Sequence, residues 1–360
     1  MSQQQTNRIA YWDNLKAFLI FTVVLGHFLI DVKFEGKVIN SLFDYIYIFH
    51  MPAFVLVSGY FSKSYIKKGA PQVNKLFGFL ILFVIFKVAL WVEQMALSGK
   101  FTKLDLIETS NAPWYLFALF VWFLLLPVFV KLGRNEAIIG TILFSILMPI
   151  NEGVGYSFSS SRIIIFLMFF VIGYYLDYEL IERLKTTLLK IVSVIYLLAL
   201  AVFVYFNLDL FEKFGPILYA SHSYSAIKTS LWVALLAKVI WIVVATITIL
   251  AVMILCPKKK LFFTYVGRGT LSVFIIHLLI RDFLRKNDWY EYIRTNLIRD
   301  FMHKKDWFEF IGKGQHYQYY AIILAVVISL IICFVFSEKH IVKLFNCAFK
   351  IVKQKGEKDE

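Results

Sequence analysis

The sequence predicts an all-α protein that crosses a membrane about ten times. Its 360 residues are 60% hydrophobic and 17% charged, with a mean hydropathy of +0.71. A soluble domain is about half apolar and about a quarter charged. The apolar residues gather in long runs such as 76–86 and 239–255, and a membrane-spanning helix needs ~20 mostly apolar residues. Composition and run length together exclude the soluble classes of protein.

Breaks at charged residues, proline and glycine divide the chain into ten predicted spans, of which the fifth is short. An even number of spans places both termini on one side of the membrane. Lys and Arg accumulate in alternate connecting segments, including 61–74, 256–260 and 338–360, so we expect that side to be cytoplasmic. The basic segment 282–317 is the exception, because it falls on the outer side. The predicted spans cover residues 13–32, 39–60, 75–96, 114–131, 136–150, 161–178, 187–206, 230–255, 261–281 and 318–337.

The segment 282–317 overlaps an internal repeat, in which IRDFLRKNDWYEYI at 280–293 is followed by IRDFMHKKDWFEFI at 298–311. The offset of 18 residues equals five helical turns, so a continuous helix would present both copies on one side. The mixture of charged and aromatic residues favours an amphipathic helix in the membrane interface. The alternative is an aromatic platform for a sugar, built on Trp289 and Trp307.

The net charge of +14 does not indicate nucleic-acid binding, because the Lys and Arg residues mostly lie between apolar segments. That placement is typical of contact with membrane lipids. Cys256, Cys333 and Cys347 have no metal-ligand spacing. We find no phosphate loop, dinucleotide fingerprint, nucleophile elbow or metal motif, so polar residues inside the spans are the remaining candidates for chemistry.

The first span carries the most informative polar residues, which are Asp13, Asn14, Lys16 and His27. Lys16 and His27 are eleven residues apart, about three helical turns, so they share one face about 16 Å apart along the axis. Either residue alone is ordinary, because a lysine can extend to the interface and a histidine can donate to a carbonyl. Together they predict a passage lined by polar groups.

Later spans add a histidine and two aromatic residues. His50 precedes Met51 and Pro52 in the second span, and an unpartnered histidine in lipid is unfavourable, so we expect it to face the bundle interior. Trp114 and Tyr115 begin the fourth span, where an interfacial aromatic belt explains them as well as substrate contact does.

Three further polar residues lie near the ends of spans. Arg162, at the outer end of the sixth span, suits an oxyanion or a carboxylate. Arg268 and His277 lie in the ninth span, and their separation of about 2.5 turns points them in different directions. His277 is therefore the weaker candidate.

In these stretches the chain resembles the acyltransferase 3 family of membrane acyltransferases, in particular the branch related to fucose 4-O-acetylases and polysaccharide O-acetyltransferases. The family's first helix has a basic residue, ten others and a histidine, which Lys16 and His27 match, with lysine where many members have arginine. The matching stretches are YWDNLKAFLIFTVVLGHF (11–28), FHMPAFVLVSGYF (49–61), PWYLFAL (113–119), SRIIIFLMFFVIGYYL (161–176) and GRGTLSVFIIH (267–277).

The resemblance implies a membrane acyltransferase domain over 1–337, followed by a basic amphipathic cytoplasmic tail over 338–360. It implies acyl-CoA, in the first instance acetyl-CoA, as the donor and a hydroxyl of a cell-envelope glycan or lipid-linked sugar as the acceptor. His27 would accept the hydroxyl proton with Lys16 as the second catalytic residue, and an acyl-histidine intermediate is the alternative. The residues expected to bind substrate are Asp13, Asn14, His50, Trp114, Tyr115, Arg162, Arg268 and His277.

The richness in Phe, Ile and Lys is typical of an AT-rich bacterial genome, so we expect a multi-pass protein of a bacterial plasma membrane. Two other functions fit intramembrane His, Lys and Arg residues. A transporter or flippase of glycan precursors is one, although the halves show no inverted repeat. A sensor or assembly subunit that keeps the fold without activity is the other. Transfer of label from acetyl-CoA to a glycan distinguishes the enzyme from both.

Overall fold

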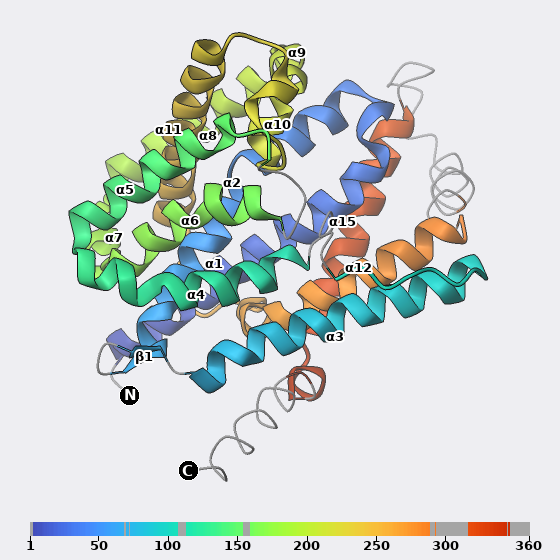
Figure 1. The fold of residues 1–360 in the computed structure, drawn as a ribbon, viewed down its shortest axis with the longest axis horizontal. Helices are drawn as coiled ribbons and strands as arrows, with labels where there is room; N and C mark the ends of the chain where they lie inside the picture. The colour runs from blue at the N-terminus through green and yellow to red at the C-terminus, as the bar shows by residue number, and fades with distance from the viewer. Residues whose placement is uncertain are drawn as a thin grey trace.

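The computed structural model describes residues 3–67, 70–71, 73–106, 113–153, 159–288, 292, 316–343 and 345. In this part the chain forms a bundle of α-helices (Figure 1). One antiparallel pair of two-residue strands, β1 (Ile66–Lys67) and β2 (Ala70–Pro71), connects α2 to α3. The predicted all-α fold is confirmed.

The helices follow one another along the chain with short 3₁₀ turns (η) between some of them. They are α1 (Gln3–Leu29), η1 (Ile30–Glu35), α2 (Lys37–Ser62), η2 (Lys63–Tyr65), α3 (Val73–Ser98), α4 (Trp114–Leu132), α5 (Arg134–Leu147), η3 (Met148–Ile150), α6 (Ser160–Tyr175), α7 (Tyr178–Leu184), α8 (Thr187–Phe206), α9 (Leu208–Lys213), α10 (Gly215–Tyr219), η4 (Tyr224–Ile227), α11 (Leu231–Leu255), η5 (Thr264–Arg268), α12 (Thr270–Lys286) and α15 (His316–Phe336).

Seven of the described helices are long and apolar enough to cross a membrane, or eight if the bent pair α6 and α7 is one span. These seven correspond to seven of the ten predicted spans. On the lipid-facing side of α8, Leu188, Ile195 and Leu198 are each more than 60% exposed, as expected for side chains dissolved in hydrocarbon. The chain is a multi-pass membrane protein.

The other three predicted spans are too short or too broken to cross a membrane as one helix. The fifth, which was predicted to be short, is α5, which has 14 residues and ends in η3. The sixth is α6, which has 16 residues and meets α7 at an angle of 87°. The ninth divides into η5 and the 17-residue α12. The backbone of η5 packs directly against α1, since a side chain at Gly267 would overlap the carbonyl oxygen of Asp13.

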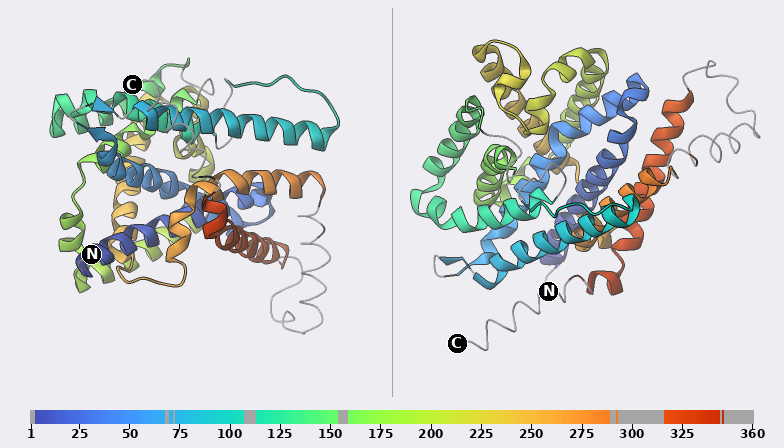
Figure 2. Two further views of the ribbon diagram at one scale, coloured as in Figure 1. Left: turned by 90° about the horizontal axis from the view of Figure 1, so that it is seen from below. Right: turned by 45° about the vertical axis from the view of Figure 1, so that its right-hand side comes forward.

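Helix α2 packs against both α1 and α6 at the centre of the bundle. Figures 1 and 2 show α12 and α15 beside α1, and these three helices contact one another. Helices α8 and α11 pack on α2. Trp122 of α4 donates from Nε1 to the carbonyl oxygen of Ile163 at 2.8 Å, which ties α4 to α6.

Two glycines let α2 and α6 approach each other closely. A methyl group at Gly59 would overlap the carbonyl oxygen of Phe170, and one at Gly173 would overlap that of Leu56. Small residues at such crossings are typical of membrane helix pairs. The α2–α6 crossing carries His50 on one helix and Arg162 on the other, so it sets the distance between these two candidate residues.

We expect Gly59→Ala to destabilise the protein by about 2 kcal/mol or more, because the added methyl forces the two backbones apart. The measurement is thermal unfolding of the detergent-solubilised protein. Gly140→Ala is the matched control, since nothing lies within 4 Å of a side chain built there. Equal stability of the two variants would contradict the close crossing.

The predicted interfacial helix over 282–317 falls mainly outside the described residues. The first copy of the repeat begins in α12, which ends at Lys286. The second copy at 298–311 lies outside the described residues, as do Trp289, Trp307 and Cys347.

Candidate functional site

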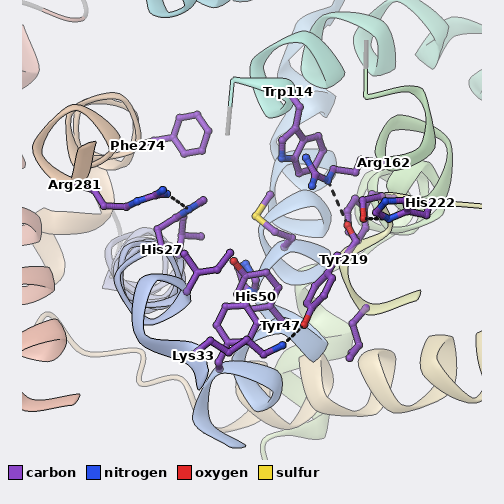
Figure 3. Close-up of a pocket in the computed structure, with 17 residues that line it drawn as sticks. His27, Lys33, Tyr47, His50, Trp114, Arg162, Tyr219, His222, Phe274 and Arg281 are labelled. Carbon is purple, nitrogen blue, oxygen red and sulfur yellow. Dashed lines mark hydrogen bonds between the residues drawn. The ribbon is translucent and has the colours of Figure 1, made fainter. Parts of the chain in front are cut away.

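A polar cavity of about 420 Å³ lies at the C-terminal end of α1, which we call the histidine cavity (Figure 3). Its polar lining contains three histidines, three cations and no carboxylate among the described residues. Helices α1, α2, α4, α6, α10 and α12 all contribute to the walls. The lining residues are Val23, His27, Ile30, Lys33, Phe43, Tyr47, His50, Met51, Trp114, Arg162, Phe166, Leu218, Tyr219, Ser221, His222, Phe274 and Arg281.

His27 stands on one wall beside Arg281 (Figure 3). Nη1 of Arg281 lies 3.5 Å from Nδ1 of His27. A guanidinium can only donate, so this contact assigns the lone pair of the neutral His27 ring to Nδ1 and its proton to Nε2. The atom of His27 that can accept a proton therefore lies next to a fixed positive charge.

The other two buried histidines on helices have the opposite tautomer. Nδ1–H of His50 donates to the carbonyl oxygen of Ile46 at 2.8 Å, and Nδ1–H of His277 donates to that of Val273 at 3.0 Å. Each ring keeps its lone pair on Nε2. The ring centroid of His277 lies 5.1 Å from that of His27, so His277 packs against the His27 ring from within the bundle.

Arg281 is held in place by carboxylates on two helical segments. Its Nε lies 3.1 Å from Oδ2 of Asp31, and its Nη2 lies 3.6 Å from Oδ1 of Asp282. The side chain is 11% exposed, and a guanidinium bound by two carboxylates keeps a fixed orientation. Arg281 was not predicted as a site residue, because it lies in the repeat at 280–293, which is typical of an interfacial helix. The four-residue spacing from His277 was the available signal, since i and i+4 share a helix face.

The opposite wall carries Arg162 and Trp114. The guanidinium carbon of Arg162 lies 5.6 Å from the Trp114 ring centroid, and its Nε donates to the carbonyl oxygen of Tyr219 at 3.3 Å. The Tyr219 hydroxyl accepts from Nζ of Lys33 at 2.5 Å, and Lys33 pairs with Asp44 at 3.3 Å. Hydrogen bonds thus connect two cations of the cavity through one tyrosine.

His222 closes the cavity beside Arg162. Ser221 Oγ lies 2.8 Å from His222 Nδ1. Burial, followed by the charge of Arg162, lowers the pKa of His222 below its ordinary value. The ring is therefore neutral at pH 7. Lys33, Tyr219 and His222 were not predicted either. They lie in connecting segments or at helix ends, where a polar side chain has no unfavourable transfer into lipid and is therefore common.

A second polar group lies at the N-terminal half of α1. Lys16 Nζ lies 2.9 Å from Asp13 Oδ1, and Arg268 Nε lies 3.1 Å from Asp13 Oδ2. Asn14 anchors the loop after α11, because its Nδ2 donates to the carbonyl oxygens of Pro257 and Lys259, both at 2.9 Å. This group is separate from the histidine cavity, as the spacing of Lys16 and His27 along α1 requires.

One smaller cavity lies at the second polar group, and another lies between it and the histidine cavity. One of about 360 Å³ is lined by Lys16, Asp13 and Lys63, and one of about 250 Å³ is lined by Lys16 and Phe274. Lys16 borders both small cavities, and Phe274 borders both the 250 Å³ cavity and the histidine cavity. The three cavities therefore follow α1 in series.

Of the predicted site residues, four line the histidine cavity itself and one packs directly behind it. The four are His27, His50, Trp114 and Arg162, and the fifth is His277. Tyr115 lines the 250 Å³ cavity, where its hydroxyl lies 2.5 Å from Ser58 Oγ. Lys16, Asp13 and Arg268 form the other group, and Asn14 stands beside it.

Comparison with known proteins gives one family match and one relative. A family model described as an acyltransferase domain matches residues 9–338. The nodulation protein NolL of Mesorhizobium japonicum is 32% identical to this chain over 140 residues, which cover 36% of this chain and 38% of NolL. The chain thus matches little more than a third of that relative's length. No solved structure matches the chain.

Proposed function

This chain belongs to the acyltransferase domain family, and from that premise we propose that it moves an acyl group from acyl-CoA to a sugar hydroxyl of a cell-envelope glycan. Acetyl is the simplest acyl group, with acetyl-CoA as the donor. The observation that carries the proposal is the series of three cavities along α1, with Lys16 and Lys63 at one end and His27 at the other.

The 360 Å³ cavity, which Lys16 and Lys63 line, suits the acyl-CoA donor. Coenzyme A carries phosphates, which a cationic mouth attracts. Its thin pantetheine arm would extend along α1, past Lys16 and Phe274, and deliver the thioester to the histidine cavity. With the termini cytoplasmic and the protein in a bacterial plasma membrane, the donor enters from inside the cell and the acceptor from outside.

The histidine cavity suits the transfer itself. The sugar oxygen attacks the thioester carbonyl carbon while its proton passes to Nδ1 of His27, where it replaces the N–H that Arg281 donates to this atom in the free protein. The negative charge that develops on the carbonyl oxygen lies beside the guanidinium of Arg281, with Arg162 on the facing wall. The carbon–sulfur bond then breaks, and the thiolate takes the proton from His27 to leave as coenzyme A. A route through an acyl-histidine would use the same cavity.

The test reconstitutes the protein in liposomes with radiolabelled acetyl-CoA on one side and an envelope glycan on the other. We expect label on the glycan when the donor is supplied on the side of the chain termini. Movement of unlabelled glycan across the membrane without acyl transfer would overturn the proposal in favour of a transporter.

Lys16→Gln is expected to raise the KM for acetyl-CoA by about tenfold and to leave kcat near the wild-type value, because it removes one contact of about 1.4 kcal/mol with the donor's phosphates. Asp13 keeps its ion pair with Arg268, so the fold is expected to persist. The control is Lys190→Gln, an exposed lysine near the N-terminal end of α8. An equal rise in KM for both variants would mean that Lys16 acts only through general surface charge.

A further inference from the structure

A second large hollow, which we call the apolar groove, lies between α2, α8, α9, α10 and α11. Its volume is about 580 Å³, within the ordinary range of ligand sites. Figure 1 shows α8, α9, α10 and α11 gathered around one end of α2. Every residue that lines the groove is hydrophobic, and nothing in the proposed acyl transfer uses it.

The groove has a buried floor and an open rim. Ile48, Leu200 and Trp241 form part of the floor and are less than 10% exposed. Phe203, Leu236 and Ile240 form part of the rim and are 48%, 61% and 53% exposed. The rim side chains lie on the outer surfaces of membrane-spanning helices, so the groove opens sideways into the lipid. A hydrocarbon chain can enter it without crossing water.

The groove adjoins the histidine cavity through α10. Ile217 and Leu218 line the groove, while Leu218 and Tyr219 line the cavity. Over these three consecutive residues the lining changes from the apolar groove to the histidine cavity, and Leu218 borders both. A molecule with a polar head in the cavity and a chain in the groove would pass across Leu218.

The charge of the cavity indicates the head group. Lys33, Arg162 and Arg281 line it, while Asp44 and Asp31, the carboxylates that pair with Lys33 and Arg281, do not. Such a lining attracts a phosphate. The groove and the cavity share one lining residue, Leu218, so we expect one chain to pass from one to the other, whereas a membrane phospholipid has two chains.

We propose that the apolar groove binds the hydrocarbon chain of the acyl acceptor, which is a sugar joined through phosphate to a single hydrocarbon chain. This inference rests on the proposed function and narrows the acceptor from glycans in general to one class of lipid-linked sugar. The groove then delivers the acceptor from the bilayer and holds its sugar toward His27.

The first experiment measures binding, so its result does not depend on acyl transfer. Farnesyl phosphate with a diazirine at the end of its chain is photolysed with the full-length protein in nanodiscs. We expect labelled peptides from α8 and α11, and competition by unlabelled farnesyl phosphate. Labelling elsewhere in the chain, or equal competition by dioleoyl phosphatidylglycerol, would overturn the proposal, because the groove would then hold ordinary membrane lipid.

The second experiment compares two valine substitutions on α11. Val233 lines the groove, whereas Val243 does not and faces lipid; they are 43% and 50% exposed. Val233→Trp fills the groove and is expected to reduce specific labelling by at least tenfold, whereas Val243→Trp leaves it unchanged. If Val233→Trp is labelled as strongly as the wild-type protein, or if both variants lose labelling equally, the groove does not bind the chain. Leu236→Trp, at the rim, repeats the test should Val233→Trp fail to insert.

Activity separates this inference from the proposed function. With acetyl-CoA as the donor, farnesyl-phosphate-linked N-acetylglucosamine is compared with the methyl-phosphate-linked sugar, which lacks the chain. A KM at least tenfold lower for the farnesyl acceptor supports the groove, and equal KM values contradict it while leaving the acyltransferase proposal intact. If neither sugar is acylated, the labelling result alone decides whether the groove binds the chain.

Discussion

His27→Ala is expected to lower kcat for acyl transfer by about 10²- to 10⁴-fold, the usual contribution of a positioned general base. The substitution removes the ring nitrogen that lies against Arg281 and would accept the hydroxyl proton. It leaves the cavity open to both substrates, so KM for acetyl-CoA is expected to change little. The measurement is the initial rate of label transfer from acetyl-CoA with saturating acceptor.

The control for this prediction is His340→Ala, because the His340 side chain is 83% exposed and distant from the cavity. Both variants are checked for monodisperse elution and wild-type helix content. A His27→Ala protein that passes these checks and transfers label at the wild-type rate would exclude His27 as the proton acceptor. Loss of activity in His340→Ala as well would point to a general effect of histidine removal on assembly.

Arg281→Gln is expected to lower kcat by about 10²- to 10³-fold, comparable to the removal of one donor from an oxyanion site. Arg281 lies within reach of His27 and is oriented by Asp31 at 3.1 Å. Glutamine keeps a donor but loses the charge and the fork of the guanidinium. The readouts are kcat with acetyl-CoA and the affinity of the free enzyme for the donor.

Arg285→Gln is the matched control for Arg281. Arg285 approaches the same Asp31 at 3.9 Å, but its side chain is 52% exposed and does not line the histidine cavity. We expect near-normal activity from this variant. If Arg281 acts together with His27, the double variant His27→Ala/Arg281→Gln will be little slower than His27→Ala alone. Independent, multiplying losses would show that the two residues act separately.

The candidate site was partly predictable, because polar residues inside a membrane span are energetically unfavourable and therefore conspicuous. His27, His50 and Arg162 were identified on that basis and do line the same cavity. Three of the residues that were missed lie at helix ends or between helices, whereas Arg281 lies inside α12. Lys33, Tyr219 and His222 stand where polar side chains are common, and only the packing of α1, α2 and α10 shows that they face inward.

The number of spans was harder to predict than their existence. Hydropathy identifies a segment by its apolar length, and it cannot detect that Gly267 brings η5 against α1 or that α6 bends sharply into α7. These features depend on contacts between segments far apart in the chain, so the sixth predicted span is bent and the ninth is divided.

The sequence by itself determined that this protein is a helical membrane bundle and that its first helix carries a lysine and a histidine on one face. Local composition and helical periodicity suffice for both, because lipid requires each span to satisfy its own backbone hydrogen bonds. Only the tertiary structure decided that Arg281 stands beside His27 and that an apolar groove adjoins their cavity at Leu218. Each of these depends on how distant helices pack against one another, which no local pattern in the chain records.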